Sequence, residues 1–285
     1  METGHSTTSY SYDRNGNRIA EQTAVPNGHQ SSTSYSYDGA NRVVSLLTTQ
    51  GSGNTAVVNE SYAYNLDGSM RTKVSGGVTT GYTYDGAGRL SSEGNGVISV
   101  TYGYDAANNR TSMNVGGVVT TYAYDANNRL LSESKAGTVK SYTYDANGNQ
   151  LTGNGLITYD ARGRQSTWTN GLTTASYTYY PNDLRKSKTV GGATTTFVWD
   201  GQNMVYEYTG TNATGGKAYY YGLTLISQGN DAYYLYNGHG DVVQLVTSTG
   251  TLGRSYAYDA FGNEVNAVSG DTNPTGGSSQ TRATR

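Results

Sequence analysis

Along most of the chain, tyrosines alternate with Thr, Ser or Ala over short stretches, such as YTYD at 82–85 and YAYD at 122–125. A period of two places the tyrosines on one face of a β-strand and the small residues on the other. Between successive stretches lies a second turn signal, such as SGGV at 75–78 or VGGV at 115–118. The pattern therefore predicts short antiparallel strands that reverse direction roughly every ten residues.

The residue after the second tyrosine marks a repeat. These anchor positions are Asp13, Asp38, Asn65, Asp85, Asp105, Asp125, Asp145, Asp160, Tyr180, Asp200, Asn237 and Asp259. Most neighbouring anchors are 20 to 27 residues apart, and the 37-residue gap before Asn237 predicts a degenerate repeat around 218–223. The fold class expected is all-β: an antiparallel meander of hairpins. Because an open sheet rarely exceeds about ten strands without curling, we expect a spiral β-sheet that forms a partial hollow shell.

The residue three positions after each anchor predicts a specific turn. At all twelve anchors it is Gly, Asn or Asp, the residues that best tolerate positive φ. A type I turn followed by a left-handed residue closes many hairpins, and an Asp at its start accepts hydrogen bonds from the turn backbone. The structural turn residues predicted in this way include Asp85 and Gly88, Asp105 and Asn108, Asp125 and Asn128, Asp145 and Gly148, and Asp259 and Gly262.

One repeat is shorter than the others. Only 15 residues separate Asp145 from Asp160, and both of its strands lose residues. We expect Asn154 and Gly155 at its tip, with strand pairing preserved because both arms shorten together.

The paired tyrosines predict a double row of rings on one face of the sheet. The rows comprise Tyr82 and Tyr84, Tyr102 and Tyr104, Tyr122 and Tyr124, and Tyr142 and Tyr144. In one interpretation the rows replace a thick core, with each hydroxyl reaching water or a backbone group. In the other, they form a platform for sugar rings. The structural interpretation is favoured because the tyrosines recur in every repeat, whereas a binding site is usually local.

Composition excludes several classes of protein. Hydrophobic residues make up 34% of the 285 residues, and 28 of them are Tyr whereas only 2 are Phe, which leaves little for a thick core. A net charge of −2 offers no basic field for a nucleic acid. No apolar run approaches the ~18 residues of a membrane span, and the sequence shows no signal peptide. Cysteine is absent, so disulfides and thiol chemistry are excluded.

Catalytic and metal-binding patterns are weak. The histidines are His5, His29 and His239, and none has the spacing of a metal site or a triad. His239 lies near Asp241 and could act as a base, but a turn residue between two glycines is the stronger interpretation. The loops at 13–17 and 145–149 resemble parts of calcium loops, yet each supplies one carboxylate and is explained by turn chemistry. We therefore expect no catalytic residue, no cofactor and no metal, and a chain that is not an enzyme.

The repeated phrases resemble a known family. YDRNGNRI, YDGAGRL, YDANNRL and YDANGNQL are similar to the YD repeats of the Rhs family, and the resemblance covers about residues 10–267. It implies the hollow β-shell that such repeats build in bacterial polymorphic toxins, insecticidal toxin complexes, wall-associated Rhs proteins and teneurins. The function implied is a non-enzymatic shell segment of a secreted or cell-surface bacterial protein. Its partners would be further YD repeats and the C-terminal toxin or effector domain that the shell encloses or presents. The alternative is an adhesion module that binds surface carbohydrate through exposed tyrosine rows.

The chain departs from that family near its end. After the AFGN phrase at 260–263, the Tyr-rich core that follows in Rhs proteins is replaced by a Ser-, Thr- and Gly-rich segment. We therefore expect a repeat region at 1–267, a disordered tail at 268–285, and a chain truncated before the Rhs-associated core.

Overall fold

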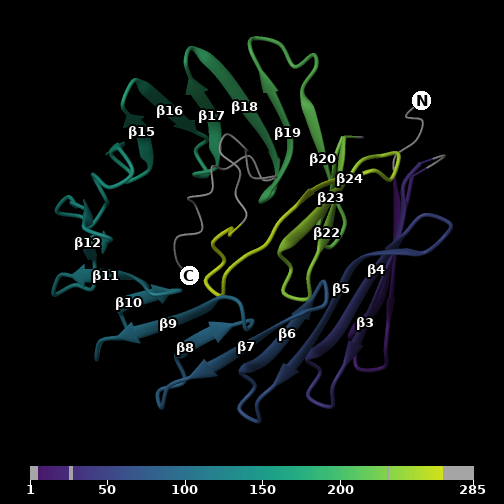
Figure 1. Ribbon diagram of the computed structural model, residues 1–285. Coiled ribbons are helices and arrows are strands. Elements are labelled where there is room, and N and C mark those ends of the chain that lie inside the picture. The colour runs from purple at the N-terminus through teal and green to yellow at the C-terminus, as the bar shows by residue number, and fades with distance from the viewer. Residues whose placement is uncertain (1–5, 26–27, 230, 266–285) are drawn as a thin grey trace. The chain divides into compact units, whose positions relative to one another are not determined.

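The computed structural model describes residues 6–25, 28–229 and 231–265 (Figure 1). Within these residues every element is a β-strand, and each strand is antiparallel to the strands it pairs with. The strands form two sheets, of 13 and 11 strands, in which the spatial order follows the chain order. The predicted antiparallel meander is confirmed. The described parts of the chain contain no helix long and apolar enough to cross a membrane.

Contacts divide the chain into two compact units, one of residues 1–82 and 221–285 and the other of residues 83–220. The strands of the first unit are β1 (Thr7–Tyr12), β2 (Arg18–Ala24), β3 (Gln30–Tyr37), β4 (Val43–Gln50), β5 (Thr55–Tyr64), β6 (Met70–Ser75), most of β7 (Val78–Tyr84), β21 (Leu225–Gln228), β22 (Ala232–Tyr236), β23 (Val242–Val246) and β24 (Leu252–Ser255). The predicted tail at 268–285 lies outside the described residues.

The first unit holds an apolar core made by strands far apart in sequence. Leu46 of β4 and Val58 of β5 pack against Leu235 of β22 and Val246 of β23, and Figure 1 shows these strands side by side. Leu46 and Val246 are almost fully buried. The late strands of the meander therefore pack on its early strands within this unit. The hollow shell itself stays a prediction.

Hydrogen bonds between turns secure this packing. The backbone N–H of His29 donates to Ser248 O at 2.6 Å, and Gln50 Nε2 donates to Gly250 O at 2.9 Å. The tips of the early hairpins are thus attached to the loop that follows β23.

The second unit contains the strands β8 (Leu90–Gly94), β9 (Ser99–Tyr104), β10 (Arg110–Val115), β11 (Val118–Tyr124), β12 (Leu130–Lys135), β13 (Thr138–Ser141), β14 (Leu156–Tyr159), β15 (Gln165–Asn170), β16 (Thr173–Tyr179), β17 (Arg185–Val190), β18 (Ala193–Asp200), β19 (Asn203–Thr209) and all but the last residue of β20 (Lys217–Tyr221).

The shortened repeat interrupts the ladder between β13 and β14. Here the pairing is reduced to an isolated bridge between Tyr144 and Gln150 and to single hydrogen bonds such as Ile157 N to Leu151 O at 2.8 Å. The expectation that pairing survives the shortening is therefore wrong. The arms that remain are too short for a regular ladder, and one sheet ends at β13 while the next begins at β14.

Several hairpin ends opposite the anchors are tight glycine turns. Gly116 and Gly117, for example, adopt φ of 55° and 93°, the two positive values of a type I′ turn. Asn203 was predicted to adopt positive φ, and this is wrong: Asp200 pairs directly with Asn203, and Gly201 between them takes φ of 58°. A two-residue hairpin at this point replaces the longer turn of the other anchors.

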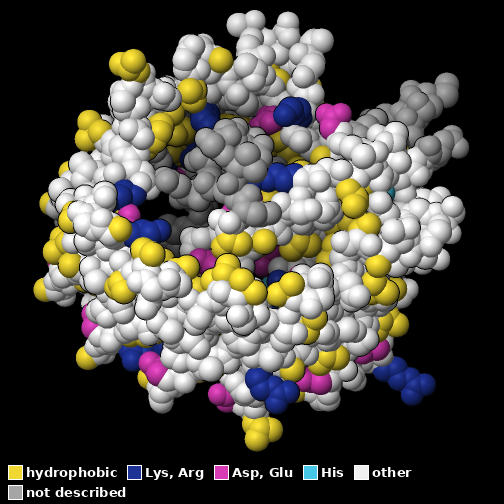
Figure 2. All heavy atoms as spheres, in the orientation of Figure 1, with side chains coloured by type: hydrophobic (Ala, Val, Ile, Leu, Met, Phe, Trp, Pro, Cys, Tyr) yellow, Lys and Arg dark blue, Asp and Glu magenta, His cyan; other side chains and the backbone are white. Residues whose placement is uncertain are grey.

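The visible surface agrees with the low charge of the sequence. In Figure 2, Lys and Arg lie scattered among Asp, Glu and uncharged atoms, and hydrophobic side chains are spread over the face in view.

Candidate functional site

Most anchor carboxylates close a turn, as Asp105 does. The Asp105 N–H donates to Asn109 O at 2.9 Å, and the Asn108 N–H donates to Asp105 O at 3.2 Å. The carboxylate atom Oδ1 of Asp105 accepts from the N–H groups of Ala107 and Asn109, at 2.9 and 2.8 Å. The Asn109 side-chain amide contributes most to lowering the pKa of Asp105, and these backbone donors add to it. Asn108 takes φ of 69°, the left-handed conformation that the turn needs.

The structure places the other predicted turn residues in the same arrangement. Values of φ are 76° for Gly88, 61° for Asn128, 86° for Gly148 and 78° for Gly262, and the carboxylates that accept two backbone N–H groups are those of Asp85, Asp125, Asp145 and Asp259. The second carboxylate oxygen is also used, because Oδ2 accepts from the side chain four residues later. Within the described residues, no group of three or more His, Cys, Asp and Glu could hold a metal ion.

The residue four positions after the anchor was missed in the sequence. Where it is Arg, it holds its own anchor: Arg89 Nε lies 2.7 Å from Asp85 Oδ2, and Arg129 Nε lies 2.6 Å from Asp125 Oδ2. The frequent Arg or Asn at this position could have revealed its role in the turn. The sequence does not show which groups the remaining nitrogens of the arginine contact.

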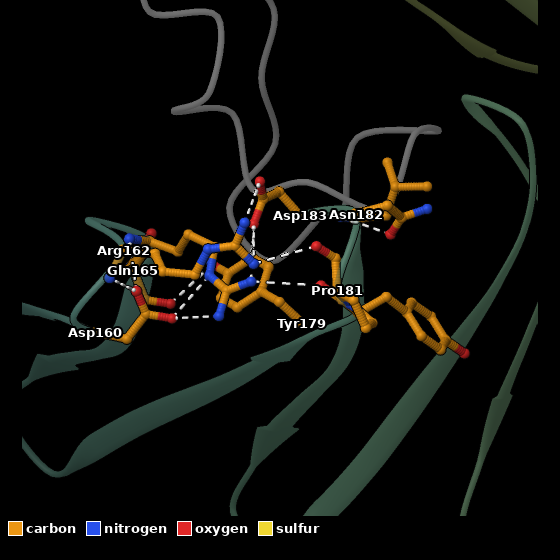
Figure 3. Close-up of polar contacts among 10 residues, drawn as sticks. Asp160, Arg162, Gln165, Tyr179, Pro181, Asn182 and Asp183 are labelled. Atoms are coloured by element: carbon orange, nitrogen blue, oxygen red, sulfur yellow. Dashed lines mark hydrogen bonds and ion pairs between the residues drawn. The ribbon is translucent and has the colours of Figure 1, made fainter.

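Arginines of one turn also reach the turn of the next repeat. Figure 3 shows the turn of Asp160 beside the turn of Asp183, with Arg162 directed at the latter. Arg162 Nη1 donates to Pro181 O at 3.1 Å, and Arg164 Nη1 lies 2.9 Å from Asp183 Oδ1. Arginine side chains of one turn thereby bind groups of the neighbouring turn along one edge of the sheet.

The second tyrosine of most repeats donates to the backbone of the repeat before it. Tyr104 OH donates to Leu90 O at 2.8 Å, Tyr124 OH to Arg110 O at 3.0 Å, and Tyr144 OH to Leu130 O at 2.8 Å. In these three contacts the acceptor lies five residues after the preceding anchor, and Arg110 and Leu130 lie beside β-bulges where the register shifts. The same contact is made by Tyr37, Tyr64, Tyr159, Tyr179, Tyr236, Tyr258 and, through its indole N–H, Trp199.

Arginines cover the faces of the same rings. Arg89 lies 4.8 Å from the ring centre of Tyr104, and Arg129 lies 5.0 Å from that of Tyr144. Each of these rings is thus fixed by a hydrogen bond at its hydroxyl and by a cation on its face.

The first tyrosine of each pair meets charged groups instead. Tyr142 OH donates to Glu133 Oε1 at 2.8 Å, and Tyr102 OH donates to the buried Glu93. Arg110 stacks on Tyr122 at 4.8 Å. The pKa of Tyr142 is raised, first by burial and then by the bond to Glu133.

The remaining predicted tyrosines lie at the end of β7. Tyr82 and Tyr84 are half-buried there, whereas Tyr142 and Tyr144 follow β13 outside any regular strand. All eight predicted tyrosines are half-buried or buried, so none presents a fully open ring.

The degenerate repeat expected at 218–223 is present as a shortened turn. Gly222 N–H donates to Thr224 O at 2.9 Å, and Leu225 O accepts from Tyr236 OH at 2.6 Å. The interrepeat contact is therefore kept even where the YD letters are lost.

His239 belongs to the turn after β22. Its N–H donates to Asn237 Oδ1 at 2.9 Å, and its ring lies edge-on to Tyr62 at 5.0 Å. Asp241, its candidate catalytic partner, accepts from Asn237 Nδ2 at 3.0 Å. These contacts place His239 and Asp241 in a turn that seats against β5, where Gly238 N–H donates to Tyr62 OH at 2.8 Å.

Sequence reasoning missed the burial of His29. The side chain is 2% exposed, and among the described residues neither ring nitrogen has a hydrogen-bond partner. It lines a cavity of about 20 Å³ with Thr23, Ser31 and Tyr233, enough for a water molecule. Burial lowers the pKa of His29.

Family models match two parts of the chain. Residues 1–116 match the Teneurin YD-shell model, and residues 124–153 match the RHS Repeat model.

Two curated bacterial proteins are similar over 104 residues. The tRNA3(Ser)-specific nuclease WapA of Bacillus spizizenii is 36% identical over 34% of this chain and 4% of its own length. The tRNA nuclease WapA of Bacillus subtilis strain 168 is 34% identical over the same shares. The chain thus spans only a small part of the relatives it matches.

Two solved toxin structures share the fold. The Tc holotoxin pore of Photorhabdus luminescens gives a TM-score of 0.55 at 14% identity, over 90% of this chain and 15% of that one. The TcdB2-TccC3-TEV crystal structure gives 0.53 at 14% identity, over 90% and 16%. At this identity the likeness shows the fold alone.

Proposed function

Because the chain belongs to the YD/Rhs-repeat family, we propose that it is a structural segment of a β-shell that encloses or presents a C-terminal toxin or effector domain. The complete protein would be a secreted or cell-surface bacterial protein. The toxin-related relatives and neighbours support this proposal.

The observation that carries the proposal is the direction of the tyrosine hydroxyls. In most repeats the second tyrosine donates to a carbonyl of the preceding repeat, as Tyr124 does to Arg110 O at 3.0 Å. Such a contact fastens repeat to repeat and uses the polar atom that a ligand would need. A sheet built in this way is stiffened along its length without a thick core.

The first strand supports a partnership with further repeats. β1 is the end strand of its sheet, and an edge strand offers unpaired backbone groups to another chain segment. Tyr12 is the second tyrosine of the first repeat, and it is 50% exposed. Within the described residues its hydroxyl has no partner, and a preceding repeat would supply the missing carbonyl.

We propose no catalytic role for this segment. The anchor carboxylates that a hydrolase would need accept backbone and side-chain donors in their turns, as Asp105 does. The nuclease activity named for the WapA proteins belongs to those proteins as wholes, of which this chain spans 4%.

No contact favours the alternative of carbohydrate adhesion. Sugars stack on free aromatic faces, and here guanidinium groups occupy ring faces such as that of Tyr104. A glycan array tests this alternative: we expect no saturable binding. Specific binding that is lost in the folded double variant Tyr122→Ala with Tyr124→Ala would establish adhesion instead.

Protease protection tests the shell. In the complete polypeptide, the domain downstream of the repeats should be cleaved much more slowly than the same domain produced alone. A variant with the wall weakened at Tyr104→Ala should lose part of this protection, whereas Tyr12→Ala should lose less. Equal cleavage rates for the enclosed and the isolated domain would refute the proposal.

A further inference from the structure

A lysine and an asparagine meet where the ladder is interrupted. Lys140 lies in β13, the last strand of one sheet, and Asn154 lies in the loop before β14, the first strand of the next. Lys140 Nζ donates to Asn154 Oδ1. Because Oδ1 is bonded to the carboxamide carbon Cγ, the lysine nitrogen lies next to an electrophilic carbon.

A carboxylate completes the group. Glu133 of β12 lies directly opposite Lys140 in the register of β12 and β13, and Glu133 Oε1 is 3.5 Å from Lys140 Nζ. Tyr142 OH donates to the same Oε1 at 2.8 Å, and the Tyr142 ring centre lies 5.3 Å from Lys140 Nζ. The side chains of Lys140 and Glu133 are about two-thirds covered, at 31% and 32% exposure.

The backbone of Asn154 is also held in place. Trp168 Nε1 donates to Asn154 O at 2.8 Å. Gly153 and Gly155 flank it with φ of 142° and 127°, and a Cβ at Gly155 would lie 2.5 Å from Thr169 O. The loop therefore packs closely against β15, which fixes the carboxamide relative to the lysine. Fixed proximity of this kind can supply much of the rate of an intramolecular reaction.

We propose that Lys140 and Asn154 form an intramolecular isopeptide bond, assisted by Glu133. Glu133 takes a proton from the Lys140 ammonium, and the free amine attacks Asn154 Cγ. The protonated Glu133 then hydrogen-bonds the developing oxyanion at Oδ1. The bond between Cγ and Nδ2 breaks as the leaving nitrogen takes up protons, and the products are Lys–NH–CO–Asn and ammonium. No oxidant or other co-reactant is consumed.

The bond would act where the regular ladder of the meander is interrupted. Between β13 and β14, regular strand pairing gives way to the bridge of Tyr144 and Gln150. A covalent link from Lys140 to Asn154 would join the ends of two sheets at this point.

The chain contains a natural comparison. Lys73 Nζ lies 3.2 Å from Glu60 Oε1, and Tyr62 OH donates to the same carboxylate, which repeats the Lys, Glu and Tyr arrangement. In that group the fourth side chain is that of Ser75, whose hydroxyl donates to Glu60 Oε1 at 2.9 Å. A hydroxyl offers no electrophilic carbon, so Lys73 should stay unmodified.

Mass spectrometry of the whole purified chain tests the proposal. Formation of the bond removes one ammonia, about 17 Da, from the intact mass. Trypsin should then leave the bond after Lys140 uncut and release residues 136–162 as one peptide that lacks this mass. Cleavage after Lys73 serves as the internal control.

A succinimide would remove the same mass and must be distinguished. Asn154 precedes Gly155, a pair that can cyclise through the glycine N–H, and Asn147 precedes Gly148 in the same peptide. A succinimide leaves the bond after Lys140 open to cleavage by trypsin and is hydrolysed on standing. The isopeptide bond blocks this cleavage and is not hydrolysed on standing. Mass loss with normal cleavage at Lys140 therefore overturns the proposal.

Three variants make the result specific. Lys140→Arg and Glu133→Gln should each restore the full mass, whereas Asn147→Ala should keep the loss of ammonia. If Glu133→Gln does not fold, the wild-type digest still decides, because an unmodified mass with complete cleavage at Lys140 refutes the bond. Loss of ammonia that persists in Lys140→Arg would also refute it.

Discussion

Replacing Tyr104 by phenylalanine removes one hydroxyl and leaves the ring in place. That hydroxyl donates to Leu90 O at 2.8 Å, and Arg89 lies 4.8 Å from the ring centre. Phenylalanine keeps the ring contacts, so the change isolates the interrepeat hydrogen bond.

The expected loss is modest and calculable. A hydrogen bond of this kind contributes about 1 kcal/mol to the free energy of unfolding, and the half-buried Leu90 carbonyl is left with less compensation from water. Tyr104→Ala should cost about 3 kcal/mol in all, because it also removes a half-buried ring and the cation above it.

Urea unfolding followed by tryptophan fluorescence measures both variants. Trp168 and Trp199 lie in the same unit as Tyr104, so they report on the part of the chain that is perturbed. The midpoint should fall for Tyr104→Phe and fall further for Tyr104→Ala, with little change in slope.

Tyr12→Phe is the matched control. Tyr12 occupies the same place in its repeat, but its hydroxyl has no partner among the described residues, so its removal should change the midpoint little. If Tyr104→Phe matched the wild type, or if both phenylalanine variants lost the same free energy, the tyrosine rows would not hold repeats together as argued.

Three further predictions concern the turns and the buried histidine. Gly88→Ala should destabilise the fold by about 1 kcal/mol in the same urea assay, because Gly88 has φ of 76°. Gly86→Ala, in the same turn at an ordinary φ and with open space around it, should be neutral, and equal effects of the two changes would contradict the turn geometry. Asp105→Ala should lower the melting temperature and flatten the loss of stability below pH 4. A carboxyl whose pKa is lowered on folding stabilises the folded state above its unfolded pKa, and this stabilisation is lost as the pH falls. An unchanged dependence of stability on pH in the acid range would count against the role of Asp105 in the turn. Burial lowers the pKa of His29 on folding, so the unfolded chain binds more protons than the folded chain below about pH 6.5, and stability should fall from pH 7 to pH 5. Melting curves of His29→Gln should show a weaker pH dependence, and an identical dependence would refute this.

Local features of the fold could be predicted from the sequence because they depend on a few adjacent residues. A glycine three residues after an aspartate specifies a turn wherever it stands, and the structure gives Gly88 and Gly148 positive φ. Alternation of tyrosine with small residues specifies which face of a strand carries the rings. Asn203 departs from the rule because Asp200 pairs with Asn203 across a two-residue turn, in which Gly201 adopts φ of 58°.

Contacts between repeats could not be predicted because they depend on register and on distance in space. Nothing local to Tyr104 identifies Leu90 O as its acceptor, since Leu90 lies in a different strand. The packing of Leu235 on Leu46 joins residues nearly two hundred positions apart, with no periodic signal to connect them. Lys140 and Asn154 meet only because the ladder breaks between them.

The central claim is that this chain forms part of a β-shell around another domain. A structure of the complete polypeptide by electron cryomicroscopy tests this claim most directly. The account predicts that further repeats pair with β1 at the edge of its sheet, that Tyr12 OH reaches a carbonyl of the preceding repeat, and that density for a separate domain is enclosed by the sheet. A complete polypeptide in which β1 stays unpaired and the downstream domain stands apart from the repeats would contradict the account.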